Sequence, residues 1–226
     1  MDKKLLNSLR DDITNIMYDT VDLLTLIGFD KRFRNNKAPQ PINAFTQVIS
    51  HNSTYAMVFS ICRQVDEDKN SISLINFLRK VINLSGKSQT SMFTMKQFCI
   101  DWNSFSAGVC NKTDGVSDQN TIAEYDWKQY ISKEDIISIK AIQADIDELI
   151  KVTKKPKVYR NKKFAHLDKH SLKHIGRNSM IYRELYDATD TIKNIVEKYY
   201  RILHLNPISG FITDDFKNHK PISITF

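Results

Sequence analysis

Apolar side chains recur at spacings of three and four along most of this chain, which is the period of an α-helix with one buried face. The pattern predicts helices over residues 3–27, 41–65 and 71–85, and a less regular one over 89–105. Gly28 follows the first of them. Because glycine is common just after the last helical residue, we expect that helix to end there.

The second half of the chain carries the clearest apolar stripes. Ser132 and the acidic residues after it are typical of a helix start, and we expect that helix to run to residue 153. Pro156 should interrupt or kink it, so that a new helix begins there, and a last helix is predicted over 179–203. The stripe of the first helix consists of Ile136, Ile139, Ile142, Ile146, Leu149 and Ile150.

The most loop-like stretch of the 226 residues is 108–120, "GVCNKTDGVSDQN". Only six Gly and five Pro are present, which favours long helices over many short strands. We therefore predict an all-α helical bundle that forms a single domain over residues 1–226. It divides into N-terminal helices (1–107), motif-bearing helices (121–205) and an extended tail (206–226).

Charge and cysteine content narrow the class of protein. The net charge of +7 and the pI near 9.2 favour polyanionic partners such as nucleic acid. Cys62, Cys99 and Cys110 are odd in number and form no C-x-x-C pair, so we expect reduced, buried thiols. No run of about 18 apolar residues occurs, so we expect a cytoplasmic protein without a membrane segment.

The basic charge gathers in residues 151–163, which hold seven positive side chains and no negative one. The run continues into "YRNKKFAHLD", residues 159–168. Arg160 presents a planar cationic fork that fits a phosphate, and His166 can take or give a proton near neutral pH. Asn161 can bond the phosphate or orient a catalytic group. Four lysines are further candidates for RNA binding: Lys155, Lys157, Lys162 and Lys163. Asp168 is a candidate for supporting the histidine ring.

These residue types suit RNA cleavage without a metal ion. The reaction needs a base for the 2′-hydroxyl, an acid for the leaving 5′-oxygen and a cation for the phosphate charge. A single histidine cannot easily serve as both acid and base in one step. Two copies related by a twofold axis can, so the chemistry predicts a homodimer. On one helix Arg160 and His166 would lie about 120° apart around the axis, so the long arginine would have to reach round.

The string "RNKKFAHLD" resembles the HEPN superfamily, whose motif is an arginine, a polar residue and a histidine after four to six intervening residues. It is especially similar to the abortive-infection branch. The resemblance implies a HEPN-like all-α fold and a dimeric, metal-independent endoribonuclease without cofactors, often a toxin or phage-defence effector with RNA as substrate and a possible cognate antitoxin. The motif transfers to Arg160, Asn161 and His166. Some relatives have a tyrosine soon after the histidine, whereas this chain has Asp168 nearby, so control by tyrosine modification is not transferred.

Three other interpretations remain open. The basic run can be a solvated helix face with His166 at the surface or at a helix end. The fold can be a HEPN-like module that binds RNA or an antitoxin without cleaving RNA. His166, His170 and His174 recur every four residues and could hold a metal ion, although lysines flank them and no cysteine or nearby glutamate completes a site.

Overall fold

A computed structural model describes residues 3–35, 44–88, 93–101, 119–161 and 182–204. The described part of the chain is helical apart from short connections and one antiparallel bridge between Thr94 and Ile136. The predicted all-α class is therefore confirmed. The elements are α1 (Lys3–Asn35), α2 (Ala44–Gln64), α3 (Leu74–Ser88), α5 (Gln119–Asp126), the π-helix η1 (Trp127–Ile131), α6 (Ile139–Arg160) and α8 (Tyr182–His204).

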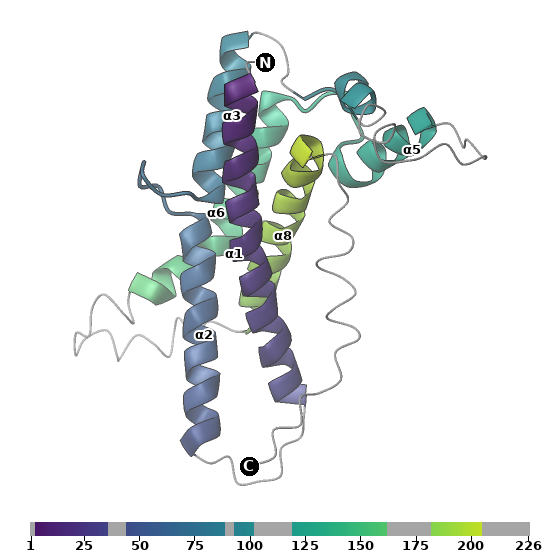
Figure 1. Cartoon of the computed structure of the whole chain (residues 1–226). Helices are drawn as coiled ribbons and strands as arrows, with labels where there is room; N and C mark the ends of the chain where they lie inside the picture. The colour runs from purple at the N-terminus through teal and green to yellow at the C-terminus, as the bar shows by residue number, and fades with distance from the viewer. Residues whose placement is uncertain (1–2, 36–43, 89–92, 102–118, 162–181, 205–226) are drawn as a thin grey trace.

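The long helices form an elongated bundle (Figure 1). Helix α1 runs along most of its length, and α2 and α3 follow one another end to end beside it. Helix α1 packs against α8 and α2, while α6 packs against α8, α2 and α3. Both halves of the sequence therefore contribute to one packed core, with α5 and η1 at one end of the bundle.

The core is built from the apolar faces of all the long helices. Trp127 and Tyr199 are its largest fully buried side chains, and each has a partner for its polar atom. The Trp127 indole Nε1 donates to the Glu134 carbonyl oxygen at 2.7 Å, and the Tyr199 hydroxyl donates to Asp145 Oδ2 at 2.7 Å. These bonds allow amphipathic aromatic groups to be buried without an unpaired donor.

Helix α1 continues past Gly28 to Asn35, so the predicted end at this glycine is wrong. The turn beyond Gly28 gains contacts with α8: the Tyr186 hydroxyl donates to buried Asp30 at 2.8 Å, and the Lys31 ammonium lies 4.6 Å from the Tyr186 ring centroid. Glycine inside a helix costs only about 1 kcal/mol, which tertiary contacts of this kind offset.

Helix α6 begins after Ser138, and the predicted start at Ser132 is wrong. The Ser138 hydroxyl accepts a hydrogen bond from the Ala141 amide at 3.1 Å, as an N-cap does. Residues 132–138 are not helical. They pair with residues 93–95, where the Met95 amide donates to the Asp135 carbonyl at 2.7 Å and the Ile137 amide to the Phe93 carbonyl at 3.0 Å.

The apolar stripe of α6 is narrower than the sequence predicted. Ile142, Ile146 and Leu149 are buried, but Ile139 and Ile150 remain 44% and 45% exposed. The predicted Ile136 lies outside the helix and is 45% exposed; its neighbour, buried Ile137, takes the core position instead.

Pro156 lies inside α6 and does not end it, so the expectation of a separate helix starting there is wrong. The proline ring is buried on the same side as Thr153, whose hydroxyl donates to the Leu149 carbonyl at 2.7 Å. Burial of this turn offsets the backbone hydrogen bond that proline removes. The last turns of α6 reach the left side of the bundle in Figure 1, where Lys157 and Arg160 are half-buried and Asn161, just after the helix, is exposed.

The remaining boundaries differ little from the predictions. Helix α3 ends at Ser88 rather than near Gly86, and α8 covers Tyr182–His204 where 179–203 was predicted. Most of the loop 108–120 and the whole tail 206–226 lie outside the described residues, so the proposed subdivision of the domain stays a prediction. None of the described helices combines the length and apolar character that crossing a membrane requires.

Candidate functional site

The predicted catalytic motif begins at the C-terminal end of α6. Arg160 is the last residue of the helix and Asn161 is its C-cap. Four of the predicted site residues lie outside the described ranges, so the position of the histidine relative to the arginine stays a prediction: Lys162, Lys163, His166 and Asp168.

Asn161 holds the Arg160 side chain. Its backbone keeps helical angles, with φ −63° and ψ −42°, and its amide donates to the carbonyls of Lys157 and Val158. Its side-chain Oδ1 accepts a hydrogen bond from Arg160 Nε at 3.1 Å. Because a guanidinium carries five N–H donors, this single bond orients the group and leaves four for a ligand. A helix that began at Pro156 would place Asn161 near a helix start, whereas the structure places it at a helix end.

Arg160 lies on the side of α6 that faces the bundle. It follows buried Ile142 by 18 residues (160 − 142), which is five turns of an α-helix, so the two side chains share one face. Beyond Pro156 this face reaches the surface, and the Arg160 side chain is half-buried. Within the described ranges it has no ion-pair partner.

Cys62 of α2 shows how close Arg160 and Lys157 come to the neighbouring helix. Burial raises the pKa of the Cys62 thiol to about 11, although the positive charges of Arg160 and Lys157 act to lower it. The thiol is therefore protonated at neutral pH and unsuited to act as a nucleophile. The expected buried, reduced thiol is confirmed here. Cys99 is free and half-buried, and Cys110 lies outside the described residues.

The lysines of α6 differ in how they are paired. Lys155, a predicted RNA-binding residue, forms an ion pair with Glu184 of α8. Lys157 is also a predicted RNA-binding residue, and its Nζ lies 3.9 Å from Glu67 Oε1. Lys151 pairs with Glu148 at 3.0 Å. Lys154 is exposed and has no ion-pair partner among the described residues.

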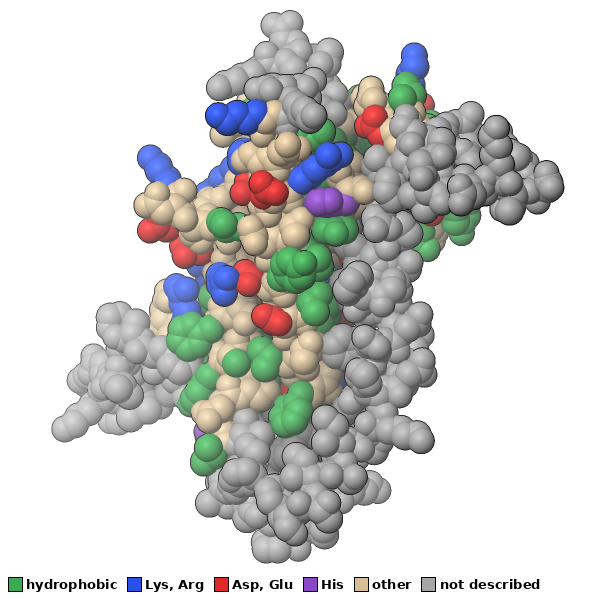
Figure 2. All heavy atoms as spheres, viewed as in Figure 1, with side chains coloured by type: hydrophobic (Ala, Val, Ile, Leu, Met, Phe, Trp, Pro, Cys, Tyr) green, Lys and Arg blue, Asp and Glu red, His purple; other side chains and the backbone are tan. Residues whose placement is uncertain are grey.

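Acidic side chains thus interrupt the basic surface that the sequence suggested. On the face drawn in Figure 2, Lys and Arg side chains lie among acidic ones and do not form one continuous patch. The cations at the end of α6 also lie at the negative end of the helix dipole, which stabilises them there independently of any ligand. This dipole contribution accounts for part of the charge pattern without a functional role.

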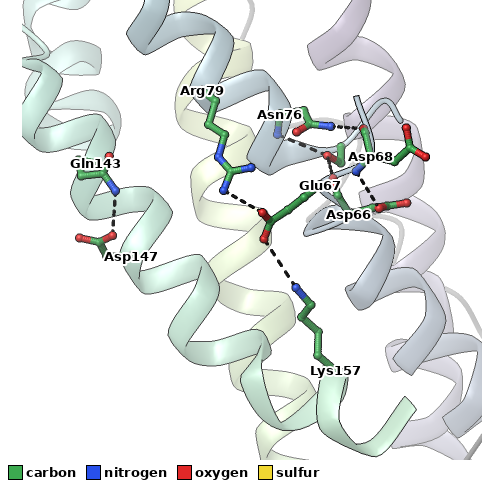
Figure 3. Close-up of polar contacts among 9 residues, drawn as sticks. Asp66, Glu67, Asp68, Asn76, Arg79, Gln143, Asp147 and Lys157 are labelled. Carbon is green, nitrogen blue, oxygen red and sulfur yellow. Dashed lines mark hydrogen bonds and ion pairs between the residues drawn. The ribbon is translucent and has the colours of Figure 1, made fainter. Parts of the chain in front are cut away.

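Glu67 and Arg79 are site neighbours that the sequence did not reveal. Glu67 lies in the α2–α3 loop (residues 65–73), and its Oε2 is 3.1 Å from Arg79 Nη2 of α3, while its Oε1 faces Lys157 (Figure 3). These residues are 12 and 90 positions from Glu67 in the sequence, so no local pattern could relate them.

No group of three or more His, Cys, Asp or Glu is placed to hold a metal ion within the described part of the chain. The alternative metal site at His166, His170 and His174 lies outside that part.

A family model supplies an independent comparison. The model described as AbiU2, of the HEPN class, matches residues 3–222, which is nearly the whole chain. Searches of curated proteins and of solved structures found no match.

Proposed function

Since the chain belongs to the AbiU2 family of HEPN proteins, we propose that it is a metal-independent endoribonuclease that acts as a homodimer in phage defence or as a toxin. The observation that carries this proposal is the position of Arg160. Its guanidinium is oriented by Asn161, lies beside Lys157 at an exposed helix end, and lacks an acidic partner among the described residues.

The proposed reaction is transfer of the RNA phosphodiester to the neighbouring 2′-oxygen. A base removes the 2′-hydroxyl proton, the 2′-oxygen attacks phosphorus, and an acid gives a proton to the departing 5′-oxygen. The products are a 2′,3′-cyclic phosphate and a 5′-hydroxyl end. We assign proton transfer to His166 of the two protomers, and stabilisation of the phosphate charge to Arg160. Asn161 positions the arginine, and Asp168 supports the histidine ring.

Lys154 and Lys157 extend the positive surface on the side of Arg160. Residues three apart on a helix are neighbours, so Lys154, Lys157 and Arg160 form a row that turns by about 120° around the axis of α6, with Lys157 in the middle. This row is suited to phosphates of a single strand, whose binding should weaken as salt concentration rises.

The decisive experiment compares wild type with Arg160→Ala, Arg160→Lys and His166→Ala on a labelled single-stranded RNA in EDTA. We expect each variant to lose at least about 100-fold in cleavage rate, because a charge-stabilising donor or a proton carrier contributes that much. Arg160→Lys tests the planar fork apart from the charge. Lys151→Ala is the control, since Lys151 is an exposed cation of α6 already paired with Glu148.

Retained helical circular dichroism would show that the variants fold. If His166→Ala cleaves as fast as wild type, the proposed mechanism is wrong. If wild type shifts RNA in a gel but leaves it intact, the chain is a non-catalytic RNA-binding or antitoxin-binding module instead. Sedimentation that shows a monomer under cleaving conditions would contradict the dimeric mechanism.

A further inference from the structure

Glu67 lies between two cations that belong to different helices (Figure 3). Its Oε2 contacts Arg79 Nη2 of α3 at 3.1 Å, and its Oε1 lies 3.9 Å from Lys157 Nζ of α6. One carboxylate thus presents two anionic oxygens to two positive groups. A phosphodiester also presents two anionic oxygens and is bound by the same donors.

The contact between these three side chains is not needed to hold the fold together. The side chains of Glu67, Arg79 and Lys157 are 51%, 43% and 38% exposed. Ion pairs with this degree of exposure contribute little to stability. The distance from Lys157 to Glu67 is also near the limit for an ion pair. The carboxylate can therefore be exchanged for another anion at small cost.

The backbone that carries Glu67 is fixed although its side chain is exposed. On either side of it, the Asp68 amide donates to Asp66 Oδ1 at 3.1 Å, and the Ser73 hydroxyl donates to the Asp66 carbonyl at 2.6 Å. The Asn76 side chain donates to the Asp68 carbonyl at 2.7 Å. The loop therefore keeps Glu67 beside the two cations, and only the side chain has to turn away to release them.

The two cations continue the row of the proposed active site. Lys157 precedes Arg160 by three residues, so the two lie on adjacent positions of α6, and the charges of both act on the thiol of Cys62. Arg79 adds a positive group on α3, on the other side of the Glu67 carboxylate from Lys157. A strand bound at Arg160 that crosses from α6 to α3 would meet Lys157 and then Arg79.

Beyond Arg79 the surface is hollowed. A cavity of about 450 Å³ between α1, α3 and the α2–α3 loop has Arg79 in its wall, together with Lys69, Asn70, Asn83 and the ion pair of Lys80 with Asp12. Amide and ammonium groups of this kind bond base edges, ribose hydroxyls and phosphates. The lining is thus chemically suited to a nucleotide that follows the one held at Arg79.

We propose that Arg79 and Lys157 form a second phosphodiester-binding subsite beside Arg160, which the Glu67 carboxylate occupies in the free protein and leaves when RNA binds. The proposal rests on the proposed function, because it assumes that Arg160 contacts RNA. It gives Glu67 a defined role: the residue competes with the substrate for two cations and so weakens binding of short or poorly placed strands.

The test measures binding of a fluorescent 2′-O-methyl RNA strand by anisotropy in EDTA at several salt concentrations. This strand lacks the attacking hydroxyl, so binding is measured without cleavage. The variants are Glu67→Gln and Arg79→Ala. Their matched controls are Glu148→Gln and Lys151→Ala, which make the same charge changes in an exposed ion pair of α6. Glu148 precedes Lys157 by nine residues and therefore lies on the opposite side of that helix.

We expect Glu67→Gln to bind about two- to fivefold more tightly than wild type at low salt, with the difference shrinking as salt rises. Arg79→Ala should bind more weakly by a similar factor, and its logarithmic salt slope should fall by about 0.7, the value for one phosphate contact on a single strand. The gain from Glu67→Gln should be smaller in the Arg79→Ala background. Both controls should differ from wild type by less than these effects.

Two results would overturn the subsite. One is equal affinity of wild type, Glu67→Gln and Arg79→Ala, with RNA cleavage still dependent on Arg160 and His166; the proposed function then survives without it. The other is an effect of Glu148→Gln as large as that of Glu67→Gln, because general repulsion would then explain both. If wild type neither binds nor cleaves RNA, the proposed function fails and the subsite fails with it.

Discussion

Two regions of helix α6 differ in whether their charged side chains have partners. In the contact between α6 and α8, Asp145 Oδ2 accepts hydrogen bonds from Lys198 Nζ at 2.8 Å and from the Tyr199 hydroxyl at 2.7 Å. These groups satisfy one another within the bundle. At the C-terminal end of α6, Lys154 and Arg160 have no acidic partner among the described residues, and Lys157 has a distant one.

This difference in pairing means that one part of α6 contributes to stability and another part is available for binding. Paired polar groups beside a core are costly to disrupt, because removing one partner leaves the other buried and unsatisfied. Exposed, weakly paired cations contribute little to stability and remain available to an anionic ligand. Substitutions in the first region should therefore change unfolding, and those in the second should change RNA binding or cleavage.

The largest effect on stability should come from the buried face of α6. Leu149→Ala should lower the free energy of unfolding by about 2–5 kcal/mol, because Leu149 is fully buried and its removal leaves a cavity. Its neighbour Ile150 is 45% exposed, so Ile150→Ala should cost less than about 1 kcal/mol. Urea unfolding followed by circular dichroism measures both, and equal costs would contradict the assigned burial.

Asp145→Asn should have the next largest effect. It removes the charge that faces Lys198 and Tyr199, and we expect a loss of about 1–3 kcal/mol in the same unfolding measurement. Asp147→Asn is the matched control two residues away. Asp147 Oδ1 accepts only from exposed Gln143 among the bonds described, and its change should stay within about 0.5 kcal/mol (Figure 3).

A smaller, pH-dependent effect is expected at His204, where α8 meets α1. Its Nε2 lies 3.0 Å from Thr14 Oγ1 and 3.3 Å from the Arg10 carbonyl. Burial lowers the pKa of His204 below its ordinary value of 6.5, with a further contribution from the Arg10 charge, while the Arg10 carbonyl and the Asp11 charge oppose the shift. The folded protein therefore favours the neutral ring.

The sign of the pH effect follows from this shift. As pH falls through about 6.5 the unfolded chain takes up a proton more readily than the folded one, so the free energy of unfolding decreases. Urea unfolding of wild type and His204→Gln above and below this pH should show a smaller decrease in the variant. An identical decrease in both would assign the pH dependence to other groups.

The smallest effect on stability should come from the end of α6. Lys154→Ala should change the free energy of unfolding by less than about 0.5 kcal/mol, because Lys154 is exposed and lacks an ion-pair partner among the described residues. Its affinity for RNA should nevertheless fall at every sequence tested, with a shallower salt slope. Unchanged affinity and slope would remove Lys154 from the binding surface.

Periodicity sufficed to predict the helical class and the helix α8, because Leu185, Ile192 and Val196 repeat along one face of it and are all buried. It failed where tertiary contacts decide the local structure. Helix α1 continues past Gly28, where Asp30 accepts a hydrogen bond from Tyr186 of α8. The residues after Ser132 pair with residues 93–95 before α6 begins.

The candidate site also has features that the sequence could predict and features that depend on tertiary contacts. Arg160, Asn161 and the lysines stand together in the sequence, so the local string was enough to propose them. The pairing of Lys155 with Glu184, and of Lys157 with Glu67, depends on helices distant in sequence and was not predictable from charge counts. The effective charge of the basic run is consequently lower than its composition suggests.

The junction of α1 with α8 has a consequence for how the chain is made. The Arg10 Nε donates to the Leu203 carbonyl at 2.7 Å across 193 positions, so α1 meets one of its principal packing partners only after the whole segment up to α8 has been translated. Until then its apolar side lacks the cover that α8 provides. A growing polypeptide would thus stay incompletely folded until translation has passed α8.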